Sequence, residues 1–162
     1  MEMNEAYEFT IERAFDIDAL SCFMCGVREI DQLIHKKEGG LLSFITDIPC
    51  EFYIMKAADI PIAVFVFSNR TITIQKERFD SLEIEFVAVS KEWRGKGIGR
   101  RILQIAQQNA LESDFLFMTT AAFVNKRYDA TGFYENFGFE KNGMKSGNTI
   151  PMYKYLGSTE SE

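Results

Sequence analysis

The amino-acid sequence predicts a mixed α/β fold in which helices cover both faces of one central sheet. The first observation is the order of apolar patterns, which reads strand, helices, three strands, helix, strand, helix, strand. The second is size, because 162 residues suffice for one domain with a sizeable core. The third is composition, with 46% apolar and 26% charged residues, as in a typical folded protein. We therefore expect one domain over residues 1–156 and a flexible acidic tail over residues 157–162.

The first half of the chain predicts a strand, a helix and a hairpin. Glu5–Ala14 alternates loosely between apolar and polar residues, as a strand does. From Ser21 to Lys37 the apolar residues follow the helical period instead, and Gly39-Gly40 ends that helix. Glu51–Ala57 and Pro61–Phe67 are apolar strands on either side of a short turn, which predicts an antiparallel pair.

The second half contains the clearest strand and the clearest helix. Leu82–Val89 is the strongest strand prediction, whereas the polar segment Arg70–Asp80 fits either a ragged strand or a mobile loop. Gly97 opens a helix whose apolar residues share one face. These residues are Ile98, Ile102, Ile105, Ala106 and Leu111. The remaining elements are a strand at Phe115–Thr119, a helix at roughly Lys126–Asn136 ended by Gly138, and a strand at Thr149–Leu156.

Composition argues against several classes of protein. No apolar run approaches the ~20 residues that span a bilayer, and the N-terminus is acidic where a signal peptide is basic. We therefore expect a cytoplasmic protein with no membrane association. The three cysteines are odd in number and cannot form a closed disulfide framework. Cys22 and Cys25 have the spacing of a zinc ligand pair, but the single histidine, His35, cannot supply a second pair, so we expect no metal.

Basic residues concentrate in one short segment of an otherwise acidic chain. The net charge is −6, which argues against a broad nucleic-acid-binding surface. Between Lys91 and Arg101, however, five basic residues stand against one acid, Glu92. This concentration favours a local anionic ligand.

The basic segment lies where a strand gives way to a helix. Leu82–Val89 runs through a turn at Ser90–Trp93 into Arg94-Gly95-Lys96-Gly97-Ile98-Gly99 at the helix start. A helix N-terminus has unpaired N–H groups and partial positive charge, and glycines without a Cβ let a ligand approach those groups. Arg94, Lys96 and Arg100 add positive charge. A diphosphate is the ligand that this arrangement suits.

Three alternatives compete for the glycine segment. The glycines could serve only to form a tight corner in the backbone. A dinucleotide site would need G-x-G-x-x-G and an acid about 20 residues later, but this segment has the spacing R-x-x-G-x-G after three strands. A nucleoside-triphosphate loop would need Lys-Ser or Lys-Thr after the glycines, and neither follows.

Two motifs in this order resemble the GNAT N-acetyltransferase superfamily. Arg94-Gly95-Lys96-Gly97-Ile98-Gly99, after Phe86-Val87-Ala88-Val89, is similar to the acetyl-CoA signature of that superfamily. Phe133-Tyr134-Glu135-Asn136-Phe137-Gly138-Phe139 is similar to its late helix-to-strand motif. The resemblance implies a mostly antiparallel central sheet, acetyl-CoA as co-substrate, and direct attack of an amine on the thioester.

The resemblance also implies a base on the central strand. The attacking amine must be neutral, yet a free alkyl amine has a pKa of ~10. Glu83 stands where similar enzymes carry a catalytic glutamate, and Glu85 shares its face because strand side chains alternate. Two carboxylates on one face would raise each other's pKa, which suits a base. The alternative is that both face solvent beside basic residues.

Further roles follow from the same resemblance. Tyr134 matches the tyrosine that similar enzymes place near the CoA sulfur, where it would protonate the leaving thiolate; the alternative is a core aromatic residue. A backbone amide near Val87, Ala88 or Val89 would stabilise the negative oxygen, and the same strand would pair with the pantetheine arm. Many relatives carry an asparagine that contacts CoA at the position of Arg127. This chain departs from that pattern.

The acceptor of the acetyl group remains open between classes. Phe23–Ile34 resembles the F-x-C-G-x-x-x-L-D-x-F-L pattern of GNAT toxins, which acetylate the amino acid on transfer RNA and have antitoxin partners. The acidic chain, together with Glu83 and Glu85, instead favours a cationic amine of a small molecule or protein. A non-catalytic acyl-CoA-binding module is a third alternative. A homodimer is compatible with the sequence.

Overall fold

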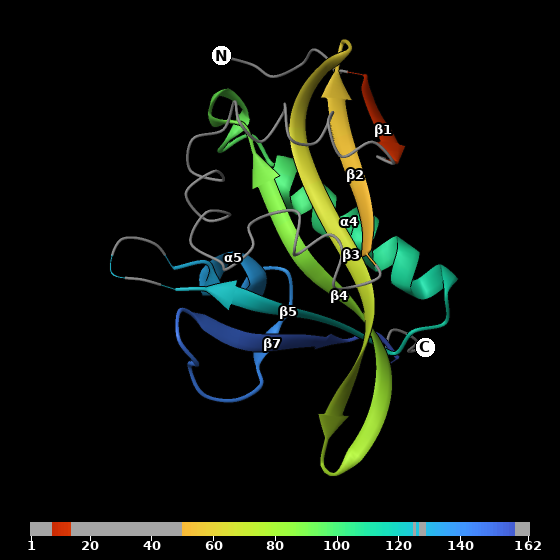
Figure 1. Cartoon of the computed structure of the whole chain (residues 1–162), viewed down its shortest axis with the longest axis vertical. Helices are drawn as coiled ribbons and strands as arrows, with labels where there is room; N and C mark the ends of the chain where they lie inside the picture. Colours follow the sequence, from red (N-terminus) through yellow and green to blue (C-terminus); the bar gives the residue numbers. More distant parts are fainter. Residues whose placement is uncertain (1–7, 14–49, 125, 127–128, 158–162) are drawn as a thin grey trace. The chain divides into compact units, whose positions relative to one another are not determined.

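The computed structural model describes residues 8–13, 50–124, 126 and 129–157 (Figure 1). Its seven-stranded sheet has the order β1-β2-β3-β4-β5-β7-β6, and the predicted mixed α/β class is confirmed. Backbone contacts divide the chain into two compact units. Unit 1 comprises Met1–Val66 and Phe86–Gly99, and unit 2 comprises Phe67–Glu85 and Arg100–Glu162. The helix predicted at Ser21–Lys37 lies outside the described residues, together with Cys22, Cys25 and His35.

Unit 1 is built on the predicted hairpin. β1 (Phe9–Arg13) pairs antiparallel with β2 (Cys50–Ala57), which leads into β3 (Ile60–Ile74). The two residues between β2 and β3 both have positive φ, as the tightest hairpin turns require. Apolar side chains of β2 and β3 then bury a small core, which consists of Phe52, Ile54, Val64 and Val66 with Cys50 and Phe86 packed against it.

The segment that the sequence left undecided is regular strand. Arg70–Asp80 supplies the end of β3 and the start of β4 (Glu77–Val89). Gln75 and Lys76, with φ values of 51° and 69°, form a two-residue turn between them. Neither residue type is a usual turn signal, because side chains other than glycine, asparagine and aspartate rarely adopt positive φ. The strand predicted to end at Phe67 therefore continues for seven more residues to Ile74.

Of the two described α-helices, α5 (Thr131–Glu135) lies in unit 2, and so does α4 (Ile98–Glu112) from Arg100 onward. α4 begins directly after Gly97, as predicted, and buries Ile102, Leu103, Ala106 and Ala110. Leu111, which the sequence places on the same apolar face, is 41% exposed near the helix end. α5 is shorter than the predicted Lys126–Asn136 helix. Residues 125, 127 and 128 lie outside the described part of the chain.

The strands of unit 2 set the positions of the polar side chains discussed below. β5 (Phe117–Phe123) pairs antiparallel with β7 (Thr149–Tyr155), which also pairs antiparallel with β6 (Glu140–Lys141). The sequence predicted a shorter β5 and no β6. β4 and β5 run parallel, and their register places Glu83 opposite Thr119. A parallel pair needs a crossover connection, and α4 forms it.

Among the described residues, no helix is both long enough and apolar enough to cross a membrane.

Candidate functional site

The strand–turn–helix arrangement predicted for the basic segment is confirmed. After β4, the Ser90 amide donates to the Ile62 carbonyl over 2.8 Å, and a short 3₁₀ helix, η1 (Lys91–Trp93), follows. Arg94–Gly97 then form an exposed turn that leads into α4. The first helical residue, Ile98, is buried and anchors the helix start.

Two glycines give this turn its shape. Gly95 and Gly97 have φ values of +73° and +82°, in the left-handed region that side chains with a Cβ rarely adopt. A Cβ built on either residue meets nothing within 4 Å. The glycines are therefore required by the backbone conformation and not by a close neighbour, and their outward side is open. Gly99 is the second residue of α4.

The basic residues of the turn have contacts of their own. Arg94 Nε donates to the Val89 carbonyl over 3.0 Å, which ties the turn back to the end of β4. Lys96 Nζ lies 5.2 Å from the centroid of the Trp93 ring, within the range of a cation–π contact. Arg100 lies over Phe137, with 5.3 Å between the guanidinium carbon and the ring centroid.

The last residues of β4 lie beyond its pairing with β5. That pairing begins at Ser81 and ends at Ile84, while β4 continues to Val89. Of the residues predicted to contact the pantetheine arm, Ala88 is buried and Val87 and Val89 are half-buried.

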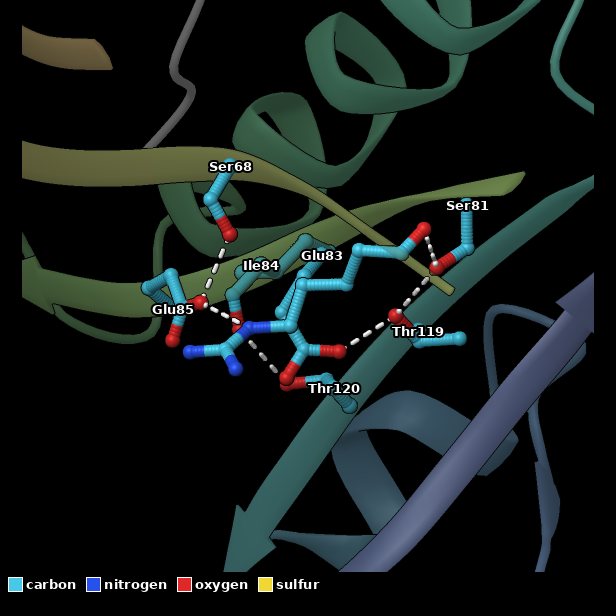
Figure 2. Close-up of polar contacts among 8 residues, drawn as sticks. Ser68, Ser81, Glu83, Ile84, Glu85, Thr119 and Thr120 are labelled. Atoms are coloured by element: carbon cyan, nitrogen blue, oxygen red, sulfur yellow. Dashed lines mark hydrogen bonds and ion pairs between the residues drawn. The ribbon is translucent and has the colours of Figure 1, made fainter. Parts of the chain in front are cut away.

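Glu85 is held in an ion pair. Its Oε1 accepts hydrogen bonds from Ser68 Oγ and from Arg70 Nε, each over 2.6 Å (Figure 2). The side chain of Glu85 is only 8% exposed, whereas that of Arg70 is 42% exposed. One oxygen of this carboxylate is thus engaged by two short hydrogen bonds, one of them from a cation.

Glu83 has a different environment on the same face of β4. Thr119 Oγ1 donates a hydrogen bond to Glu83 Oε1, and Ser81 Oγ lies 3.2 Å from Thr119 Oγ1 (Figure 2). Burial raises the pKa of Glu83, the Thr119 hydrogen bond lowers it, and the charge of Glu85 raises it further. Arg70 opposes the shift, but the net pKa lies above the usual value. The sequence analysis expected repulsion between the two carboxylates to raise this pKa, but burial is the main cause and the charge of Glu85 contributes less.

Tyr134 packs among aromatic side chains. It lies in α5, is 8% exposed, and makes edge-on contacts with Phe133 and Phe139, with centroids 5.0 and 5.4 Å away. α5 begins beside Asp129, whose Oδ1 accepts hydrogen bonds from the amide and the hydroxyl of Thr131.

Sequence reasoning missed Thr119, Ser81 and Arg70. Thr119 is 36 residues from Glu83, and only the parallel register of β4 and β5 brings them together. Arg70 lies in the segment that carried no clear pattern. Within the described part of the chain, no group of three or more histidine, cysteine, aspartate or glutamate residues could hold a metal ion.

Comparisons with known proteins agree with this architecture. A family model described as an acetyltransferase (GNAT) domain matches residues 50–141. The comparison with curated protein sequences gives no match.

Solved structures share the fold at low sequence identity. A Bacillus subtilis acetyltransferase in complex with CoA has a TM-score of 0.63 and 15% identity, over 92% of this chain and 99% of that one. An Elizabethkingia anophelis GNAT family acetyltransferase with acetyl-CoA bound has a TM-score of 0.59 and 14% identity, over 91% and 98%. A mutant of the toxin AtaT, bound to the C-terminus of the antitoxin AtaR and acetyl-CoA, has a TM-score of 0.60 and 14% identity, over 91% and 92%.

Proposed function

This chain belongs to the GNAT acetyltransferase family, and from that premise we propose that it transfers an acetyl group from acetyl-CoA to a primary amine of a small molecule or protein. The observation that carries the proposal is the half-buried Glu83 carboxyl, which accepts a hydrogen bond from Thr119 and whose pKa is raised mainly by burial. This residue lies on β4, the strand that leads into the exposed glycine turn. One strand thus presents a base and continues into the segment proposed to bind the co-substrate.

The glycine turn is the proposed diphosphate site. Gly95 and Gly97 leave the turn open on its outer side, and the positive end of the helix dipole at the start of α4 suits an anion. Lys96 and Arg100 are exposed and bring positive charge to the same stretch. Arg94, which ties the turn to Val89, would hold the shape of the site.

Glu83 is the proposed general base. A carboxylate whose pKa is raised accepts a proton more readily than an ordinary one. Glu85 is the weaker candidate because its carboxylate is engaged by Arg70 and Ser68. Its negative charge instead helps to raise the pKa of Glu83.

Two further roles complete the proposed reaction. As the amine nitrogen attacks the thioester carbon, a backbone N–H within Val87–Val89 would stabilise the oxygen that becomes negative. Glu83 would take one proton from the nitrogen, and the hydroxyl of Tyr134 would give one to the departing sulfur. The late motif in which Tyr134 lies supports this assignment.

An acetyl-transfer screen over amines, peptides and charged tRNAs tests the proposal. At least one amine should be acetylated by the full chain, and Glu83→Gln should lower kcat by about 10²–10⁴-fold because the base is lost. The Glu83→Gln protein should still be stabilised thermally by acetyl-CoA. Binding of acetyl-CoA with no transfer to any acceptor would instead favour a non-catalytic acyl-CoA-binding module.

A second candidate is a toxin that acetylates the amino acid on transfer RNA and has an antitoxin partner. The observation that favours it is the likeness in fold to the toxin AtaT. The net charge of −6 argues against it, because an RNA-binding surface is usually basic. Expression that arrests growth, with relief by Tyr134→Phe, would favour the toxin.

A further inference from the structure

A chain of three polar contacts within hydrogen-bonding distance links the Glu83 carboxyl to the backbone of β3. Thr119 Oγ1 contacts Glu83 Oε1, Ser81 Oγ lies 3.2 Å from Thr119 Oγ1, and Ser81 Oγ donates to the Arg70 carbonyl over 3.2 Å (Figure 2). Ser81 is fully buried and Thr119 nearly so. Water therefore does not compete freely for these hydroxyl groups.

We propose that Ser81 and Thr119 form a hydroxyl relay through which Ser81 disfavours the ionised form of Glu83 and so adjusts its strength as a base. This inference rests on the proposed role of Glu83. The two hydroxyl residues are positioning residues, because they act on the reaction only through the Glu83 carboxyl.

The argument is a count of protons along the chain of contacts. Each contact needs one hydrogen, and a hydroxyl group carries only one. The Arg70 carbonyl can only accept, so the proton of Ser81 is used there. Thr119 must then donate to Ser81, and no hydroxyl proton is left for the contact between Thr119 and Glu83. All three contacts are hydrogen bonds at once only when Glu83 itself carries a proton and donates it to Thr119.

The ionised carboxylate leaves the relay one proton short. If Thr119 turns its proton to Glu83, then Ser81 must give up either Thr119 or the Arg70 carbonyl. A buried contact that loses its hydrogen costs free energy, so Ser81 penalises the ionised form of Glu83 without contacting it. The charged groups that act directly on Glu83 are Glu85, which raises its pKa, and Arg70, which lowers it.

The relay suits a base that must accept and then release a proton. When Glu83 Oε1 takes a proton from the amine nitrogen, Thr119 rotates its hydroxyl proton toward Ser81, and Ser81 donates to Arg70. No covalent O–H bond of either hydroxyl breaks, because each hydroxyl keeps its own proton and only the hydrogen-bond partners change. When Glu83 gives the proton to solvent, the two hydroxyl groups rotate back.

A carboxyl titration of the full chain tests the relay without any acceptor or turnover. The Glu83 resonance is identified in protein labelled with ¹³C at glutamate side chains, by its absence from Glu83→Gln. Ser81→Ala should lower the titration midpoint of Glu83 by about half a pH unit, because Thr119 can then serve the carboxylate alone. An unchanged or raised midpoint would overturn the proposal.

Thr119→Val separates a relayed effect from a general one. It should raise the midpoint, because the carboxylate loses its donor while burial persists. In the Thr119→Val background, Ser81→Ala should leave the midpoint unchanged, since the connection is cut. An equal shift from Ser81→Ala in both backgrounds would show that the effect does not pass through Thr119, and would refute the relay.

Two further variants guard against simple structural damage. Thr120→Val removes a neighbouring buried hydroxyl, which donates to the Ile84 carbonyl over 3.1 Å, and should leave the Glu83 midpoint in place. If Ser81→Ala fails to fold, Ser81→Cys replaces it, because a thiol is a weak donor and should shift the midpoint in the same direction.

The relay and the proposed function can fail separately. If Glu83→Gln abolishes acetyl transfer but Ser81→Ala leaves the titration of Glu83 unchanged, the base stands and the relay falls. If Ser81→Ala lowers the titration midpoint of Glu83 as expected but Glu83→Gln keeps full turnover, the relay acts on Glu83 but Glu83 is not the base. When both stand, Ser81→Ala should move the acidic limb of the kcat/KM profile to lower pH, and Thr119→Ser should leave that limb in place.

Discussion

Gly97→Ala is the substitution whose cost the backbone geometry defines best. With φ at +82°, a Cβ meets no neighbouring atom within 4 Å, so the whole penalty is conformational. The left-handed region costs an L-residue about 1–2 kcal/mol, and the reduced freedom of the unfolded chain returns about 0.4–1 kcal/mol. A net loss of about 1 kcal/mol corresponds to a fall in Tm of about 2–4 °C for a chain of this size.

Thermal unfolding, with Gly132→Ala as the matched control, measures this loss. A Cβ on Gly132 also meets nothing within 4 Å, but this residue lies within α5 and no positive φ is required there. Alanine is a better helix former than glycine, so Gly132→Ala should keep or raise the Tm. If Gly97→Ala were as stable as the unsubstituted chain, or both variants fell equally, the conformational argument would be refuted.

The same residue tests the co-substrate site. Acetyl-CoA at about 100 times its Kd should stabilise the unsubstituted chain by about 2.7 kcal/mol, which raises the Tm by roughly 5–10 °C. Gly97→Glu places a negative side chain at the open side of the turn and should abolish that rise. A full rise in the Gly97→Glu protein would place the diphosphate elsewhere.

Three further outcomes follow from the electrostatics of unit 2. The pKa of Glu83 is raised on folding, so its ionisation opposes folding above its usual titration range. Glu83→Gln should therefore raise the Tm at pH 8 relative to the unsubstituted chain, and this gain should vanish as the pH falls below about 4. Arg70→Gln should raise the Glu83 midpoint, because the cation lowers that pKa and its removal also frees the charge of Glu85; a lowered midpoint would contradict the assignment. The hydrogen bonds from Thr131 lower the pKa of Asp129, so Asp129→Ala should lower the Tm at neutral pH and lose this effect as the Asp129 carboxylate is protonated, which melting curves across pH would reveal.

The fold was predicted from sequence patterns that span only a few residues. The hairpin of β2 and β3 and the passage from β4 into α4 follow from apolar periodicity and from the positions of glycine, which act over a few residues. The turn of the β3–β4 hairpin could not be predicted from the sequence, because it uses Gln75 and Lys76 at positive φ. The exposure of Leu111 was not predicted, because a helical pattern does not show where a helix extends beyond the core that it covers.

The candidate site was predictable only where it is contiguous in sequence. The glycine turn and Glu83 could both be proposed from the sequence, because each is recognised from its own strand or helix start. Thr119 and Ser81 could not, because their meeting depends on the register of two parallel strands that a helix separates along the chain. Arg70 reached Glu85 from the neighbouring strand in the same way. Pairings between distant strands are set by packing of the whole sheet, which a single sequence does not display.

The hydrogen bond from Arg94 Nε to the Val89 carbonyl has a practical consequence for engineering. The guanidinium of Arg94 ties the loop to the end of β4. A lysine, with a single ammonium on a flexible stem, would not reproduce the planar geometry of that group. Anyone who transplants Arg94–Gly99 into another scaffold must therefore supply a strand whose last carbonyl points back at the loop. Without that carbonyl, the transplanted hexapeptide would keep its two glycines but lose the hydrogen bond that ties the turn to the strand.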